Sequence, residues 1–391
     1  MAISAFIGTS QALYGREAAT QASHRALEQV GRNPVFLGIV ISSYHHPVQQ
    51  VMSGVSALVG DAPLIGFGTS AEINSDGLNH HSSIVILLSG ENTNARAEWL
   101  PGFGEDSRGV TQRMANLLQL FHSEGSLLLI ADGFSGDARQ ACAALPPGNY
   151  QVAGCLAGGD LHQARTYQIG GRQSGTNGLA AAFITGNIAI GVGAAHGWQP
   201  IGAYFRVTSA SGPWVRTLDD KRVAEVYSEL FHYPTRDWSF PPLNEIVRLY
   251  PLGVETKGQE TLLVRSPLRM ESDGSLRMNS SIPEGSSVHI LVGSTSHCLE
   301  AVKIATKQAL QELGKARPVL ALVLPDISWQ KLFQATPGLE IQTVREMLGP
   351  NIPIVGGYTF GQIASLKESK ENNPLELLNQ HFEIILFGEK E

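Results

Sequence analysis

The chain has 391 residues, a length that predicts two or three domains at about 150 residues per domain. Hydrophobic residues make up 43% of the sequence and charged residues 16%, so the chain can bury a large core and is not disordered. The formal net charge is −7 and no run of lysine or arginine occurs, which excludes the cationic face that a nucleic-acid partner requires.

The cysteines and the apolar segments indicate the cellular compartment in which the protein works. Cys142, Cys155 and Cys298 form no CxxC pair, which favours a reducing compartment and argues against a disulfide framework or a zinc site. The N-terminus lacks the basic start and long apolar run of a signal peptide. The longest uncharged apolar stretch, residues 178–195, contains Gly186-Asn187, which predicts two strands joined by a hairpin turn. We therefore expect a soluble, cytoplasmic protein without membrane insertion.

A pattern of elements recurs three times along the chain. Each copy has an amphipathic helix, an apolar run typical of a strand buried on both faces, a second helix and two more strands. The first helices span residues 17–30, 110–121 and 299–313, the strands after them span 35–41, 127–130 and 319–324, and the last strands span 84–88, 179–184 and 382–387. Such crossovers predict an α/β fold of two domains built from three α-β-α-β-β repeat units with mixed sheets.

The middle strand of each copy ends in a glycine, and an acidic or amide residue follows six positions later. Residues 63–73, 151–161 and 353–363 align without gaps. The matching residues are Gly66, Gly154 and Gly356, followed by Glu72, Asp160 and Gln362. We predict that the glycines are structural and allow either a close backbone approach or a positive φ.

A different stretch, residues 188 to about 295, separates the second copy from the third. It predicts strands at 188–192 and 204–208, a short helix at 223–231, and strand-like pieces at 245–249 and 262–264. We place a domain boundary near residue 220. Residues 1–219 then hold two repeat units plus strands, and residues 220–391 hold the third unit.

Polar side chains cluster where the predicted strands end. Ligands of parallel α/β sheets bind beyond the carboxyl ends of the strands, which predicts a site there. The candidate ligand-binding residues are Ser43, Tyr44, His45, Thr69, Ser70, Glu72, Asp160, Tyr358, Thr359 and Gln362. Their hydroxyls, amide and carboxylates suit a compact polar ligand.

Catalytic and metal-binding patterns are weak in this sequence. Glu72 and Asp160 could form a carboxylate pair for acid–base chemistry, but equivalent repeat positions favour carboxylates that accept backbone N–H bonds in a turn. The adjacent pairs His45-His46 and His80-His81 would point to opposite faces of a strand, so neither predicts a chelate. No nucleophile elbow, HExxH or Walker motif occurs, and we predict no catalytic residue and no metal.

Several of these segments together resemble the FIST domain family. Residues 63–73 are similar to its Gly-x-x-x-x-Gly-Glu-Ile segment, with Ala71 in place of the second glycine, and residues 152–160 are similar to its Gly-Gly-x-Ala-x-Asp segment. Further similar segments follow in the family's order at 197–202, 250–254, 273–276 and 353–363. Where the family often has a Cys and then a Gly-Arg pair, this chain has Leu-Pro-Asp-Ile-Ser at 324–328.

The resemblance implies a FIST N-like domain over 1–219, a FIST C-like domain over 220–391, and a sensory role in small-ligand binding. The ligand it implies is small and polar, with amino acids as candidates, and occupancy would be reported to a separate signalling protein. We expect no catalysis by the chain itself and no cofactor. Two alternatives stay open: a haem-based nitric-oxide sensor of the same family, and an enzyme acting on a small polar metabolite.

Overall fold

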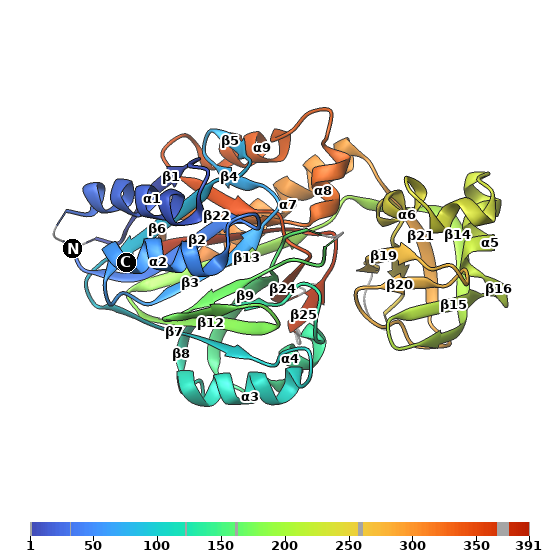
Figure 1. Ribbon diagram of the computed structural model, residues 1–391, viewed down its shortest axis with the longest axis horizontal. Coiled ribbons are helices and arrows are strands. Elements are labelled where there is room, and N and C mark those ends of the chain that lie inside the picture. The colour runs from blue at the N-terminus through green and yellow to red at the C-terminus, as the bar shows by residue number, and fades with distance from the viewer. Residues whose placement is uncertain are drawn as a thin grey trace.

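The computed structural model describes residues 2–31, 33–121, 123–160, 163–256, 261–365 and 375–390. It has a large body and a smaller lobe, which lie side by side along the long axis (Figure 1). The body contains three six-stranded sheets, and the lobe contains one eight-stranded sheet. No helix in the described ranges is both long and apolar enough to cross a membrane.

Three units of similar element order make up the body, which confirms the predicted repeat. Each unit also has a first strand and a hairpin that the predicted α-β-α-β-β unit lacks, and unit III has one additional helix. Unit I comprises β1 (Ser4–Ser10), α1 (Gly15–Val30), β2 (Val35–Ser43), α2 (Val48–Val59), β3 (Leu64–Thr69), β4 (Glu72–Asn74), β5 (Gly77–Asn79) and β6 (Ser83–Ser89). Unit II comprises β7 (Thr93–Pro101), α3 (Ser107–Leu118), β8 (Glu124–Ala131), α4 (Ala138–Ala144), β9 (Asn149–Leu156), β10 (Gln168–Gly170), β11 (Gln173–Gly175) and β12 (Gly178–Gly186). Unit III comprises β13 (Ile188–Ala195), α7 (Thr295–Leu313), β22 (Arg317–Pro325), α8 (Ile327–Leu332), α9 (Leu339–Leu348), β23 (Ile354–Gly357), β24 (Gly361–Ser365), β25 (Leu375–Leu378) and β26 (Phe382–Glu389).

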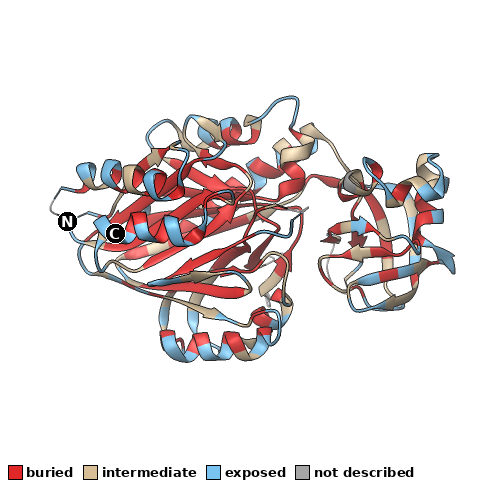
Figure 2. Ribbon diagram, in the orientation of Figure 1, coloured by how far each residue is buried: buried red, intermediate tan, exposed pale blue. Residues whose placement is uncertain are grey.

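Mixed sheets are confirmed in all three units. In unit I, β2 is parallel to β3 and antiparallel to β6, because a helix crosses over between the first pair. The same relations hold for β8 with β9 and β12, and for β22 with β23 and β26. Apolar side chains from the sheets of all three units, such as Ile39, Leu128 and Leu322, share one core. Figure 2 shows this buried interior, with the exposed faces of the helices turned outward.

The units interlock through their hairpins. Hairpin β4–β5 of unit I extends the sheet of unit III, β10–β11 extends that of unit I, and β24–β25 extends that of unit II. The last strand of one unit and the first strand of the next belong to different sheets. The predicted hairpin at Gly186-Asn187 is therefore wrong: β12 pairs with β7 and β8, whereas β13 pairs with β26.

The three glycines of the repeat occupy equivalent places. Their partners in the parallel ladders are Val40 for Gly66, Leu129 for Gly154 and Val323 for Gly356. A Cβ added at these glycines would lie 2.2, 1.8 and 1.9 Å from the partner's carbonyl oxygen. None of the three has a positive φ. Close approach of two backbones is therefore the reason for glycine at each site.

The gap-free alignment of the second copy is wrong beyond its glycine. Ile73 pairs with Gly356 and Ile363 pairs with Gly154, but the residue that pairs with Gly66 is Ile169. The structural counterpart of Glu72 and Gln362 is consequently Gln168. Asp160 belongs instead to an added loop, where its backbone exchanges hydrogen bonds with Arg165.

The smaller lobe is an insertion in unit III between β13 and α7. Its strands are β14 (Trp198–Ser211), β15 (Trp214–Leu218), β16 (Lys221–Arg222), β17 (Leu252–Val254), β18 (Leu263–Arg265), β19 (Pro267–Met270), β20 (Leu276–Met278) and β21 (Ser287–Gly293), and its helices are α5 (Val223–Phe231), η1 (Thr235–Ser239), α6 (Leu243–Ile246) and η2 (Val247–Leu249). The described pairings in this lobe are antiparallel.

Two sequence predictions fall in this lobe. The strand predicted at 245–249 is wrong, because α6 and η2 cover it, with helical bonds such as Ile246 N–H to the Pro242 carbonyl. A short apolar run does not distinguish a strand from a helical turn. The domain boundary near residue 220 falls between β15 and β16 and stays a prediction.

Candidate functional site

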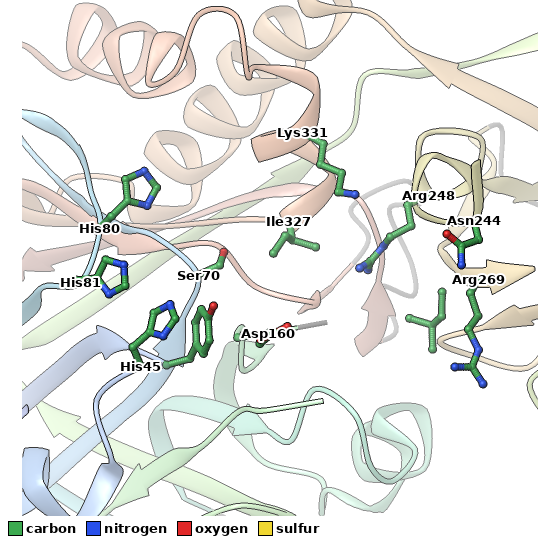
Figure 3. Close-up of a pocket in the computed structure, with 13 residues that line it drawn as sticks. His45, Ser70, His80, His81, Asp160, Asn244, Arg248, Arg269, Ile327 and Lys331 are labelled. Atoms are coloured by element: carbon green, nitrogen blue, oxygen red, sulfur yellow. The ribbon is translucent and has the colours of Figure 1, made fainter. Parts of the chain in front are cut away.

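A cavity of about 510 Å³ lies between the body and the lobe (Figure 3). All three units contribute loops or helix starts that follow strands, and the lobe closes the other side. The lining residues are Tyr44, His45, Ser70, His80, His81, Gly159, Asp160, Asn244, Arg248, Leu268, Arg269, Ile327 and Lys331.

The fold explains why these segments meet. The loops after β2, β3 and β9 and the start of α8 after β22 all lie at carboxyl ends of parallel strands, where ligands of α/β sheets bind. The hairpin exchange holds the three sheets together, so that these ends converge. The cavity therefore depends on the whole fold and not on one unit.

Four of the ten predicted site residues line this cavity: Tyr44, His45, Ser70 and Asp160. The other six do not line it, and all six are buried. They are Ser43, Thr69, Glu72, Tyr358, Thr359 and Gln362. The predicted residues lie at the end of the sheets where this cavity opens, but six of them are buried hydrogen-bonding residues beneath it.

Glu72 and Gln362 have equivalent roles, because each accepts a hydrogen bond from the turn that leads into the last strand of its unit. Glu72 Oε2 accepts the backbone N–H and the hydroxyl of Ser82, each at 2.8 Å, and Gln362 Oε1 accepts the N–H of His381 at 3.2 Å. Ser82 and His381 both immediately precede the last strand of their units. Burial raises the pKa of Glu72 to about 7, and the bonds from Ser82 act in the opposite direction. This geometry favours the turn-acceptor interpretation of Glu72.

The other buried candidates also make bonds within the fold. Thr69 Oγ1 donates to the carbonyls of Ala71 and Tyr358, at 3.0 and 2.9 Å. The Tyr358 hydroxyl donates to Glu340, and Thr359 Oγ1 accepts from Gln362 Nε2 at 2.9 Å. These side chains fix the strand ends that carry the cavity loops.

Aromatic rings form one wall of the cavity. The ring centroids of Tyr44 and His45 lie 3.9 Å apart, and those of His45 and His81 lie 4.3 Å apart. Burial lowers the pKa of His45, and His81 lowers it further. Strand geometry argued against His80-His81 as a chelating pair. Both histidines line the cavity because they follow β5 in a loop, where His81 has a φ of 55°.

The opposite wall carries cationic side chains that the sequence analysis missed: Arg248, Arg269 and Lys331. Arg269 Nε donates to Glu271 Oε1 at 3.0 Å. Arg248 is only 2% exposed, and none of its three guanidinium nitrogens has a hydrogen-bond partner among the described residues. Burial lowers the pKa of Arg248, and the nearby carboxylate of Asp326 opposes that shift. No motif marks Arg248, since its segment predicts a strand.

Gln380 fixes the position of Arg248. Its Nε2 donates to the Arg248 carbonyl at 2.7 Å, and its backbone N–H donates to Asp326 Oδ2 at 3.2 Å. The indole N–H groups of Trp198 and Trp329 both donate to the Gln380 carbonyl, at 3.0 and 2.9 Å. The backbone of Arg248, which belongs to the lobe, is thus hydrogen-bonded to unit III.

Arg265 docks the lobe onto the body. Its guanidinium, 2% exposed, donates to the Leu377 carbonyl and to Glu376 Oε1, both at 2.9 Å. Arg139 of unit II contacts the same Glu376 oxygen at 3.1 Å. These contacts hold the lobe against the body, which favours a preformed cavity.

A haem, which the family resemblance offered as an alternative, does not fit this cavity. Haem pockets surround the macrocycle with apolar side chains, and the histidines here could only supply the axial ligand. The aliphatic side chains in the lining are Leu268 and Ile327, and the others include Arg248, Lys331 and Asp160. Over the described residues, no group of three or more His, Cys, Asp or Glu side chains is arranged to hold a metal ion.

Comparison with known proteins gives a family match. The FIST N domain model matches residues 36–221 and the FIST C domain model matches residues 224–365. A search of the curated proteins finds no match.

Among solved structures, the chain is similar to a cyanuric acid hydrolase from A. caulinodans, at 6% identity and a TM-score of 0.35, with 100% of both chains covered. It is also similar to phosphoribosylformylglycinamidine synthase II from Thermotoga maritima, at 8% identity and a TM-score of 0.25, with 99% of this chain and 72% of that chain covered. Identities and TM-scores this low carry no argument about what this chain binds or does.

Proposed function

The chain belongs to the FIST family, and from that premise we propose that it is a sensory protein that binds a small polar ligand in the cavity between body and lobe. The observation that carries the proposal is the convergence of strand-end segments from all three units and the lobe on one cavity of about 510 Å³. That volume lies within the range of small-molecule sites. Amino acids remain candidate ligands, because the lining offers both cations and the Asp160 carboxylate.

Signalling would follow from the place of the cavity between the two parts. A ligand that contacts His45 of the body and Arg248 of the lobe adds interactions that the unliganded protein lacks. Differential affinity of this kind is what allows a ligand to change a conformational equilibrium. A separate signalling protein would then recognise the ligand-bound arrangement, and the chain itself would perform no catalysis.

A thermal-shift screen of amino acids and related polar metabolites tests this proposal. A ligand that binds only the native state adds about 2.7 kcal/mol at a hundredfold excess over its Kd, so at least one compound should give a saturable rise in melting temperature. No rise with any compound would contradict ligand binding.

Two near-isosteric variants test whether the compound that raises the melting temperature binds in the cavity. Asp160→Asn should weaken binding of the compound found and leave the unliganded melt nearly unchanged, because Asp160 lines the cavity. Glu72→Gln should change the unliganded melt, because the carboxylate is buried and bonded to Ser82. The opposite pattern would move the site away from the cavity.

Two further measurements test the enzyme and haem alternatives. In the first, the compound that the screen identifies is incubated with the protein. Conversion of that compound into a product would favour the enzyme. A Soret band in the absorption spectrum of the purified protein would favour haem despite the polar lining.

A further inference from the structure

Arg248 differs from Arg265 and Arg269 because its guanidinium has no hydrogen-bond partner among the described residues, although its Cζ lies 5.8 Å from the ring centroid of Phe360. It is 2% exposed, its three nitrogens have no hydrogen-bond partner within the described part of the chain, and Figure 3 shows its guanidinium directed from the lobe into the cavity. A buried cation without hydrogen bonds is strongly unfavourable. The fold nevertheless holds its backbone in place through Gln380.

Arg265 of the same lobe provides the comparison. It is equally buried, at 2% exposed, but it donates to a carboxylate oxygen of Glu376 and to the Leu377 carbonyl. Its charge is therefore satisfied by the protein. The Asp326 carboxylate acts on Arg248 through its charge, but it accepts hydrogen bonds from Ser328 and Gln380.

We infer that Arg248 binds the oxyanion of the ligand, so that the cavity takes a small molecule carrying a carboxylate or a phosphate. A guanidinium presents a planar fork of N–H donors that matches either group. The other cations of the lining, Arg269 and Lys331, favour the same sign of charge. Next to Arg248, the buried Oδ1 of Asn244 also has no hydrogen-bond partner among the described residues. That oxygen would accept a bond from a donor group on the same ligand.

This inference rests on the proposed function, and its test uses defined probes. Melting temperature is followed against acetate, succinate and inorganic phosphate, with acetamide and succinamide as neutral counterparts and chloride to hold the ionic strength constant. We expect a saturable rise with at least one oxyanion and none with the amides. A response to the carboxylates alone or to phosphate alone identifies which oxyanion the site takes.

Variants of the two arginines complete the test. In Arg248→Met, the affinity for the active probe should fall at least tenfold, equivalent to about 1.4 kcal/mol. Its unliganded melting temperature should stay equal or rise, since an apolar side chain of similar size replaces a buried guanidinium that has no hydrogen bonds. Arg265→Met should instead melt several degrees lower, because it leaves Glu376 without that partner.

Three results would overturn the inference. They are the absence of any oxyanion response, an oxyanion response that persists in Arg248→Met, and a lower unliganded melting temperature in that variant. The last would make Arg248 the counter-ion of Asp326, or a residue satisfied by buried water. These results leave the proposed function standing if neutral or cationic compounds of the metabolite screen still raise the melting temperature. The proposed function fails only if those compounds also give no response.

Discussion

Gly154→Ala tests the backbone contact on which the repeat depends. The added Cβ would lie 1.8 Å from the Leu129 carbonyl oxygen, 2.7 Å from its carbon and 2.9 Å from its nitrogen. All three are main-chain atoms of β8, the parallel neighbour of β9, and they cannot move without disturbing the ladder. Overpacking a core costs about 1–3 kcal/mol or more, and an obstacle made of backbone places this variant at the upper end, about 3 kcal/mol.

Thermal unfolding measures this loss, with Gly38→Ala as the matched control. Gly38 also lies in a buried strand, but its Cβ would first meet the terminal Leu64 Cδ2, at 2.6 Å, and a side-chain tip can rotate away. For a chain of 391 residues, a loss of 3 kcal/mol corresponds to a melting temperature lower by about 4 °C. An unchanged melt for Gly154→Ala, or an equal loss for both variants, would refute the reasoning.

Two further predictions concern buried charges. Burial raises the pKa of Glu72 from its ordinary 4.5 to about 7, so the protonated form is favoured in the folded state. The resulting stabilisation is complete below pH 4.5 and is lost as the pH rises through 7, by about 3 kcal/mol. Denaturation by urea at several pH values should show this loss in the native protein and not in Glu72→Gln, and equal slopes would contradict it. Arg265→Met should lower the free energy of unfolding by about 3 kcal/mol, against less than about 1 kcal/mol for Arg269→Met, whose side chain is 55% exposed. Similar losses in the two urea titrations would contradict that difference.

Local patterns in the sequence predicted the helices and the long central strands of each unit, but not the first strands β1 and β7 or the hairpins that the units exchange. The apolar runs before Gly66, Gly154 and Gly356 predicted strands, and the repeated glycines predicted equivalent close contacts, which the ladders confirm. Which sheet each hairpin joins could not be predicted, because pairing between units is not encoded in residue spacing. The shift from Asp160 to Gln168 was missed for the same reason, since only the register with β3 reveals it.

The residues of the candidate site were also predictable only in part. Tyr44, His45, Ser70 and Asp160 were predicted from their places after strands, and all four line the cavity. Burial could not be predicted, so Glu72 was included although its carboxylate lies within the fold. Residues contributed by the lobe required its position relative to the body. Arg248 became a candidate only through its burial and missing partners, which no sequence pattern expresses.

A crystal structure of the protein with the compound that gives the largest thermal shift tests the central claim most directly. The account predicts that the compound lies in the cavity, with the rings of Tyr44 and His45 on the body side and Arg248 on the lobe side, and with its oxyanion within hydrogen-bond distance of the guanidinium. A compound bound elsewhere on the chain, with the cavity unoccupied, would contradict it.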